Sequence, residues 1–474
     1  MRFTQQGWRN RMQRCTTDHS GDTGIMHFCK AFLFFILLGA LSMSLAACGP
    51  AKRIFGEDEK PPLEGERLSV LQYQDGLEPD PVLASSQMEL PESWRNSFWP
   101  QSGGYPSHAM GHLGLDMPLT RKWSASVGTA GHRRRPILAR PVIADGKVFT
   151  LDAAARLSAF EAESGKRLWQ RSITPKNETE TGTVGGGIAF SEGRLFAGAG
   201  YMQIAAYNPE TGETLWTQNT AAPIRSAPAV GSGRVFVITL DNKIQAFNAE
   251  NGEFLWDYSG VLETTNLLGS SAPAVYRNIV VAALSSGEVL ALRTENGQVL
   301  WQDNLASLRR HGALPGISDI RGLPVIDRGI IYVIGASGRM VALDENSGRR
   351  IWQQEIGGTE TPWPVGDTVF VLTDDRQLVA LSRHNGRIHW VERLDDLLDR
   401  IDPKDPPVWT GPVFGGERLI LASNQGHVLE LDPYSGSVKN SWTLRSGTVI
   451  PPVIADGRLY ILGQDAQLSA FGGK

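Results

Sequence analysis

Cysteine is scarce in this sequence of 474 residues. Its three cysteines are Cys15, Cys29 and Cys48, and none follows in the rest of the chain. A disulfide framework is therefore excluded for residues 118–474, where most of the tryptophans lie. Stability there must come from a buried apolar core, and a domain of roughly 355 residues is long enough to form a large one.

The sequence also lacks the patterns of long amphipathic helices and of common catalytic or metal sites. Helical spacing of apolar residues is missing, which excludes a helical solenoid. No Asp-rich calcium loop and no nucleophile elbow occurs. His108 and His112 have no metal-ligand partners at a fixed spacing, and the glycine-rich stretch 182–190 precedes a strand, where a phosphate loop precedes a helix. No catalytic, cofactor-binding or metal-binding residue is therefore assigned, and a net charge of −4 does not favour nucleic acid as a partner.

What the chain does contain is one pattern repeated six times at identical spacing. An alanine is followed six residues later by a glycine, and four residues after that by a tryptophan. The tryptophans of these copies are Trp169, Trp216, Trp256, Trp301, Trp352 and Trp390. A seventh copy is degenerate, because Glu430 replaces the alanine and Trp442 comes two residues late after Gly436. Successive tryptophans lie 38 to 52 residues apart, which is the period of propeller blades.

Each repeat predicts four short antiparallel strands, because apolar residues alternate with polar ones between Asp-Gly, Ser-Gly and Glu-Gly turns. The last unit, from Ile450, ends at Lys474 without its final strand, whereas the strand around Trp123 has no unit of its own. We therefore expect an all-β fold over 118–474. It is an eight-bladed β-propeller of four-stranded antiparallel blades, with the ring closed by the N-terminal strand around Trp123.

The repeated tryptophans are predicted to be structural. An indole buries a large area, and the glycine and alanine of the pattern leave space for it between adjacent blades, with its N–H directed to a backbone carbonyl. The residues assigned to this docking are Trp123, Trp169, Trp216, Trp256, Trp301, Trp352, Trp390 and Trp442.

The N-terminus carries an apolar run at 31–48 that ends in Leu45-Ala46-Ala47-Cys48, as in a bacterial lipoprotein signal. We expect a signal peptide over 1–47, with Met26 as the alternative start, and a lipid on Cys48. A cysteine within an uncleaved anchor is the other interpretation. Gly49 favours outer-membrane over inner-membrane sorting. Residues 48–117 are expected to form a lipidated tether and an extended segment, whose aromatic part at 93–106 lies along the ring or marks a partner site.

Over 118–474 these repeats resemble the tryptophan-docking repeats of eight-bladed propellers related to pyrroloquinoline quinone dehydrogenases. Within that superfamily the chain is most similar to the BamB family of outer-membrane protein assembly factors, which are non-catalytic lipoproteins. The resemblance implies no enzyme activity and no cofactor. The implied partners are the POTRA domains of the barrel-assembly protein BamA, other components of the assembly complex, and unfolded outer-membrane proteins.

The resemblance also implies a partner-binding surface on two loops, at 259–273 and 305–324. Leu267 matches a contact leucine of the family, and Asp319 matches an acidic contact. Leu268 stands where relatives can have arginine, and Arg321 where they can have a second acid. A buried loop anchor is the alternative for Leu267, and a turn or cap residue for Asp319.

The lipoprotein signal and the resemblance together imply a lipid-anchored scaffold on the periplasmic face of the outer membrane. By the resemblance, it is expected to assist insertion of β-barrels by docking on BamA. Two other classes stay open, a periplasmic quinone-dependent dehydrogenase and a polymer- or peptidoglycan-binding propeller. The second would use Trp363 and Trp409, which lie outside the repeats.

Overall fold

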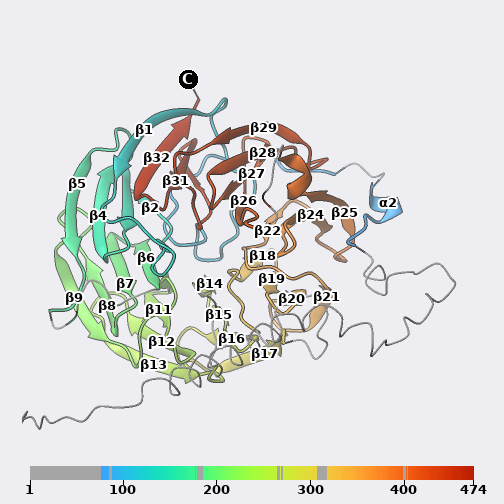
Figure 1. Ribbon diagram of the computed structural model, residues 1–474. Coiled ribbons are helices and arrows are strands. Elements are labelled where there is room, and N and C mark those ends of the chain that lie inside the picture. The colour runs from blue at the N-terminus through green and yellow to red at the C-terminus, as the bar shows by residue number, and fades with distance from the viewer. Residues whose placement is uncertain are drawn as a thin grey trace, which may run out of the picture. The chain divides into compact units, whose positions relative to one another are not determined.

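The structure is a computed structural model that describes residues 76–473, except 85–87, 177, 179–184, 264–266, 268, 270, 307–317, 399–401 and 403. The predicted signal peptide, Cys48 and Leu268 lie outside the described residues. The described chain forms eight sheets of four antiparallel strands, arranged as the blades of a ring (Figure 1). This confirms the eight-bladed β-propeller.

The blades follow one another in sequence, and the first strand of each lies nearest the channel. Blade 1 is β2 (Val142–Ala144), β3 (Lys147–Leu151), β4 (Arg156–Glu161), β5 (Arg167–Ser172); blade 2 is β6 (Gly186–Ser191), β7 (Arg194–Ala199), β8 (Gln203–Tyr207), β9 (Thr214–Asn219); blade 3 is β10 (Ala229–Gly231), β11 (Arg234–Ile238), β12 (Lys243–Asn248), β13 (Phe254–Ser259); blade 4 is β14 (Ala274–Tyr276), β15 (Ile279–Ala283), β16 (Glu288–Arg293), β17 (Val299–Asn304).

The second half of the ring repeats the arrangement. Blade 5 is β18 (Val325–Asp327), β19 (Ile330–Gly335), β20 (Arg339–Asp344), β21 (Arg350–Gln354); blade 6 is β22 (Trp363–Val365), β23 (Thr368–Leu372), β24 (Gln377–Ser382), β25 (Ile388–Arg393); blade 7 is β26 (Trp409–Gly415), β27 (Arg418–Ser423), β28 (His427–Leu431), β29 (Val438–Thr443); blade 8 is β30 (Val453–Ala455), β31 (Arg458–Leu462), β32 (Gln467–Gly472), β1 (Thr120–Ser126). Within the described residues two short helices, α2 (Pro81–Ala84) and η3 (Leu394–Leu397), lie outside the blades.

The outermost strand of blade 8 comes from the front of the chain. β1 pairs antiparallel with β32, and Trp123 lies opposite Ala470. The blade therefore joins strands that are more than 340 positions apart in sequence, and its hydrogen bonds hold the two ends of the ring together.

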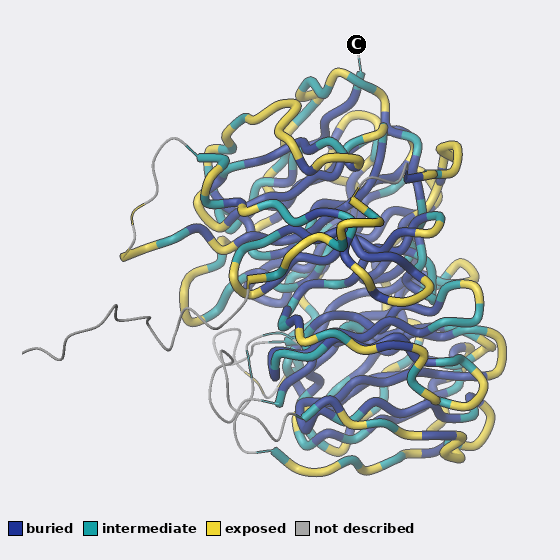
Figure 2. Tube along the Cα trace, turned by 90° about the vertical axis from the view of Figure 1, so that its right-hand side faces the viewer, coloured by how far each residue is buried: buried dark blue, intermediate teal, exposed yellow. Residues whose placement is uncertain are grey.

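The apolar core lies between neighbouring blades. First strands such as β2 are fully buried and contact the first strands of adjacent blades, whereas outer strands such as β5 are largely exposed (Figure 2). Between blades 1 and 2, for example, the Phe149 ring lies 6.1 Å from Trp169 and 6.3 Å from Phe190. Each blade thus buries its faces only because it has neighbours.

Seven of the repeated tryptophans make the same contact with the next blade. The indole N–H of each donates to a backbone carbonyl in the turn between the third and fourth strands of that blade, over 2.7–3.2 Å. The ring covers the turn glycine. A Cβ added at Gly165 would lie 2.4 Å from the Trp123 ring, and one at Gly212 would lie 2.7 Å from Trp169. The tight spacing between blades therefore depends on these glycines.

Trp442 departs from this scheme. Its N–H donates to the buried Glu430 carboxylate of its own blade at 3.1 Å, and its ring packs on Phe471, 4.6 Å between centroids. The reason is that blade 8 takes its last strand from β1, so no turn glycine follows β32 for Trp442 to cover. Glu430 at the alanine position supplies the missing acceptor.

Residues 94–116, which we call the channel segment, make one turn inside the ring at one end of the channel. The two ends of the segment lie side by side and are joined by two backbone hydrogen bonds. The backbone N–H of Trp94 donates to His112 O, and the backbone N–H of Gly114 donates to Trp94 O. The light-blue trace within the ring follows this path (Figure 1). The aromatic stretch at 93–106, expected along the ring, thus lies within it.

The channel segment hydrogen-bonds to all eight blades in their order around the ring. Its partners in blades 8, 1, 2, 3, 4, 5, 6, 7 and again 8 are Ile454, Ile143, Phe190, Val230, Val275, Ile326, Trp363, Phe414 and Gly457. All except Gly457 belong to first strands. Blade 6 has Pro364 at the central position of its first strand, so the Trp363 side chain bonds to Gly111 O instead of a backbone N–H.

Candidate functional site

The two ends of the ring differ. The channel segment contacts turns that join first to second strands, such as 416–417 and 456–457. The opposite end, which we call the loop rim, carries the connections between blades and the turns that join second to third strands. The two loops expected to form the partner-binding surface, at 259–273 and 305–324, are both connections between blades, so the candidate site lies at the loop rim.

Four exposed apolar side chains lie on neighbouring loops of this rim. Met202, Leu240, Val261 and Leu262 are 50, 49, 56 and 66% exposed. The loops are joined by hydrogen bonds: Thr220 N–H donates to Met202 O, Leu240 N–H to Pro223 O, and the Asn242 amide to Val261 O. These four residues, which we call the apolar patch, therefore span adjacent loops of blades 2 to 4, and exposed apolar groups gathered in this way are typical of a protein-binding surface.

Leu267 lies on the same connection as Val261 and Leu262. It is half-buried, and its backbone N–H donates to the Asp319 carboxylate at 2.8 Å. Leu268 lies outside the described residues. A bond between residues 52 positions apart thus fixes where the Leu267 loop crosses the rim.

Asp319 is fully buried and forms an ion pair with Arg225, 2.5 Å between Oδ2 and Nη2. The Arg225 side chain is itself 6% exposed. A buried charge without its partner is costly, so the two residues depend on each other. In this arrangement the Asp319 side chain faces the Leu267 loop and Arg225. Its geometric role is to hold that loop against the connection between blades 2 and 3, which carries Arg225.

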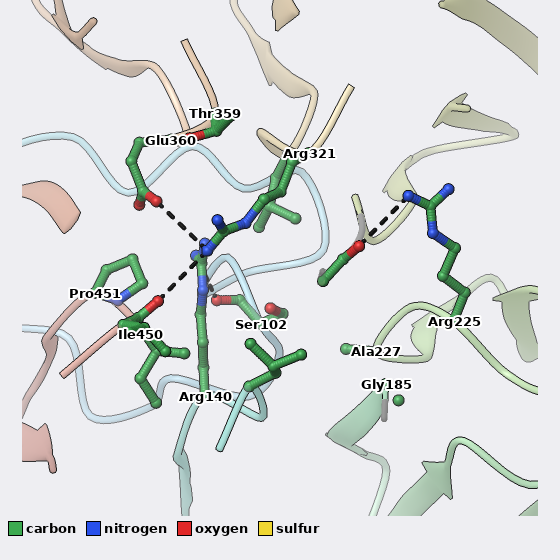
Figure 3. A pocket seen from close by; sticks show the side chains of 15 residues that line it. Ser102, Arg140, Gly185, Arg225, Ala227, Arg321, Thr359, Glu360, Ile450 and Pro451 are labelled. Carbon is green, nitrogen blue, oxygen red and sulfur yellow. Dashed lines mark hydrogen bonds and ion pairs between the residues drawn. The ribbon is translucent and has the colours of Figure 1, made fainter. Parts of the chain in front are cut away.

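Arg321 points into the channel. At the loop-rim end of the channel it lines a cavity of about 50 Å³ together with Ser102, Arg140, Arg225 and Glu360 (Figure 3). Burial lowers the pKa of Arg140 to about 10, and the nearby charge of Arg321 acts in the same direction while Glu360 opposes it. The Arg140 guanidinium therefore stays charged near neutral pH.

Trp363 and Trp409, the candidates for a glycan-binding groove, are both buried. The Trp363 ring stacks on Trp99 at 6.3 Å, and its N–H donates to Gly111 O. Trp409 is 4% exposed and packs near His427. With 6% and 4% of their surfaces exposed, the two indoles do not form an open groove, although Trp409 lines a cavity of about 120 Å³.

The two histidines of the channel segment anchor its backbone. His108 Nδ1 lies 2.8 Å from Pro324 O, and burial lowers the pKa of His108 to about 4. His112 Nδ1 lies 2.7 Å from Pro91 O, and its Nε2 accepts from Glu417 N–H. Among the residues that the structure describes, no three His, Cys, Asp or Glu side chains gather in a way that suits a metal ion.

A quinone with Ca²⁺, as the wider superfamily uses, does not fit the channel residues. Ca²⁺ takes six to eight oxygen ligands, whereas Glu360 is the one carboxylate that the described residues place in the wall of the channel cavity. One oxygen of Glu360 already accepts from Thr410 Oγ1 and Gly411 N–H. In addition, the channel segment fills the other end. We derive no reaction through such a cofactor.

Helices able to cross a membrane do not occur within the described part of the chain. Few features of the sequence alone pointed to the residues of the candidate site. The Leu267 and Asp319 positions came from family resemblance, whereas the apolar patch and the channel arginines carry no motif and emerge only when the loops are placed side by side.

Comparison with known proteins fits this geometry. The family model for outer membrane protein assembly factor BamB matches residues 153–392 and 398–474. BamB of Salmonella typhimurium is 27% identical over 74% of this chain and 88% of its own length, and BamB of Escherichia coli is 28% identical over 73% and 87%.

Solved structures show the same fold. BamB from Moraxella catarrhalis superposes with a TM-score of 0.62 at 19% identity, covering 75% of this chain and all of that one. A europium-containing methanol dehydrogenase reaches 0.63 at 13% identity, covering 79% and 98%. Both likenesses concern the fold alone. It is the match to the family model over most of the propeller that assigns the function class, and by it the chain belongs to the family of outer-membrane protein assembly factor BamB.

Proposed function

We propose that this protein is a non-catalytic scaffold of the outer-membrane β-barrel assembly complex that docks on the POTRA region of BamA through its loop rim. The observation that carries the proposal is the apolar patch beside the Leu267 loop. A rigid ring holds four exposed apolar side chains on adjacent loops, and the buried Asp319–Arg225 pair fixes the loop next to them.

The proposed docking uses apolar burial in preference to surface charge. Covering a leucine such as Leu262 contributes roughly 1.5–3 kcal/mol, and residues of this kind at the centre of an interface tend to dominate its affinity. Asp319 contributes indirectly, because its carboxylate positions the Leu267 loop. Arg321 instead faces the channel cavity, so the proposed contact does not use it.

In the proposed arrangement the lipid on Cys48 holds the ring at the periplasmic face of the outer membrane. More than one acyl chain is needed for stable attachment, and the bacterial lipoprotein modification supplies several. The ring then orients the POTRA domains and helps to hand over unfolded barrel proteins.

The test is co-purification of BamA from detergent-solubilised membranes with the full-length lipoprotein as bait. We expect the wild type to recover BamA and Leu262→Glu to lose at least tenfold of it, because a charge cannot be buried in an apolar contact. Leu255→Glu is the matched control. Leu255 is an exposed leucine on the outer strand β13 of the same region, away from the loop rim, and its variant should recover BamA normally.

Two outcomes contradict the proposal. If the wild type never recovers BamA, the assembly role fails. If wild type and Leu262→Glu recover equal amounts, the docking surface lies elsewhere on the ring. Thermal unfolding of each variant shows whether a loss reflects misfolding.

A further inference from the structure

Arg140 and Arg321, which line the channel cavity, have guanidinium N–H donors that acceptors of the described chain do not use. Arg140 donates to Ser102 O at 3.1 Å and to Thr361 Oγ1 at 3.4 Å. Among the described residues, Arg321 donates to Val449 O alone, at 3.4 Å, and its Nη2 lies 3.8 Å from Glu360 Oε1. Each guanidinium carries five N–H donors, so most of them are left for a ligand or for water. Figure 3 shows the two side chains converging on one point of the cavity.

Negative charge around this point is limited. Within the described part of the chain, Glu360 is the single carboxylate lining the cavity, and its other oxygen is engaged by blade 7. The third arginine, Arg225, is already paired with Asp319. Asp374 lines a neighbouring cavity with Glu360 and does not line this one. Burial, reinforced by Asp375 and Glu360 and opposed by Arg321, raises its pKa to about 6, so Asp374 is mostly ionised near pH 7. At the cavity wall itself, apart from the paired Arg225, two cations face one anion.

The cavity is shaped for a small group. The channel segment, through Ser102, forms part of its wall. Since that segment closes the opposite end of the ring, access is from the loop rim. A volume of about 50 Å³ suits a few waters or one carboxylate- or phosphate-sized group, because a single water needs about 10–15 Å³.

We propose that this cavity binds a small anion, with carboxylate or phosphate oxygens accepting hydrogen bonds from the guanidiniums of Arg140 and Arg321. Arginine forks match such oxygens in pairs, and these charge-assisted bonds are stronger in a partly enclosed site than in bulk water. The proposal does not depend on docking to BamA. The ligand is a free small molecule that bears the anionic group.

The experiment is calorimetric titration of the full-length protein in detergent with inorganic phosphate and, separately, with acetate, at constant ionic strength near pH 7. We expect saturable binding of one anion per chain. Arg321→Gln should weaken it at least tenfold, since bonds to charged groups are strong. Glu360→Gln should strengthen it severalfold, because it removes the competing charge. Arg171→Gln, an exposed arginine on β5, should leave it unchanged.

The opposite signs expected for Arg321→Gln and Glu360→Gln separate a specific site from general attraction. Binding of phosphate alone identifies a phosphate ligand, and binding of acetate alone identifies a carboxylate ligand. The proposal fails if neither anion binds saturably, or if Arg321→Gln binds as well as wild type. Should Arg321→Gln unfold, Arg321→Lys keeps the charge without the fork, and undiminished binding by that variant rejects the paired recognition.

Discussion

At the scale of single residues, the sequence and the structure indicate different roles for Asp319. Family resemblance marks Asp319 as a contact for another protein, whereas the structure buries its side chain against Arg225 and the Leu267 backbone. The sequence could not reveal this, because Arg225 lies 94 positions away on another blade connection and nothing in the local pattern links the two.

Asp319→Ala should destabilise the fold by about 3–5 kcal/mol, because it leaves the Arg225 charge buried without a partner. Denaturation by urea measures the loss. Asp396→Ala is the control: it removes an exposed pair with Arg393 at 3.7 Å and should cost less than about 1 kcal/mol. Equal effects for the two variants would contradict the structural role of Asp319.

His108 should make the fold sensitive to mild acid. Its pKa is lowered to about 4 by burial, against about 6.5 in an unfolded chain. Between these values the unfolded state binds a proton that the native state does not. Titration of His108 therefore leaves the free energy of unfolding unchanged above pH 6.5. As the pH drops toward 4, protonation of His108 in the unfolded state lowers that free energy by up to about 3 kcal/mol.

The check is to compare unfolding free energies at pH 7 and pH 4.5 in wild type and in His108→Gln. The variant should be less stable at pH 7, because the bond to Pro324 is disturbed, but its stability should change less with pH. Parallel pH curves for the two proteins would show that His108 is not the responsible group.

At the scale of elements, the blades could be predicted from the sequence and the channel segment could not. Alternation of apolar residues and the alanine–glycine–tryptophan spacing each act within one repeat, so they predict strands and the docking turns directly. The channel segment instead bonds to separate strands around the ring, through its backbone at some blades and through the side chains of Asn96 and Gln101 at others. Isolated bonds of this kind follow no periodic pattern, and only Trp99, buried against Trp363, hints at the position of the segment.

Docking between blades can be tested with two glycines of the same backbone conformation. Gly212 and Gly193 both have a φ of 71°, but a Cβ at Gly212 meets the Trp169 ring at 2.7 Å, whereas one at Gly193 meets nothing within 4 Å. Both alanine variants share the cost of a left-handed residue.

Gly212→Ala should therefore be more destabilising than Gly193→Ala by about 1–3 kcal/mol, as expected for overpacking. Thermal or chemical unfolding of the pair gives the difference, which isolates the contact with tryptophan. If the two variants unfold alike, the indole adapts to the added methyl and the turn glycine is needed for its backbone conformation alone.

At the scale of the whole molecule, attachment to the membrane and docking on a partner are predicted to depend on different parts of the chain. Cys48 is the predicted lipid site, and Cys15 and Cys29 fall within the predicted signal peptide. The ring between 118 and 474 contains no cysteine, so its folding should not depend on any of the three.

Cys48→Ser should abolish incorporation of labelled palmitate and release the protein from the outer-membrane fraction, while the propeller remains folded. Cys15→Ser and Cys29→Ser should behave like wild type, which makes them internal controls. Lipid labelling and membrane fractionation are the measurements. Retention of label in Cys48→Ser would move the attachment site and with it the predicted start of the mature chain.

The channel segment also limits how this ring can change in evolution. Its residues 94–116 meet the first strand of each blade in turn, and its two ends then pair with each other. The length of the segment therefore matches the circumference of the ring. A ring that gained or lost a blade would leave the segment too short or too long to close on itself, so blade number and segment length are expected to vary together among relatives that share this inner turn.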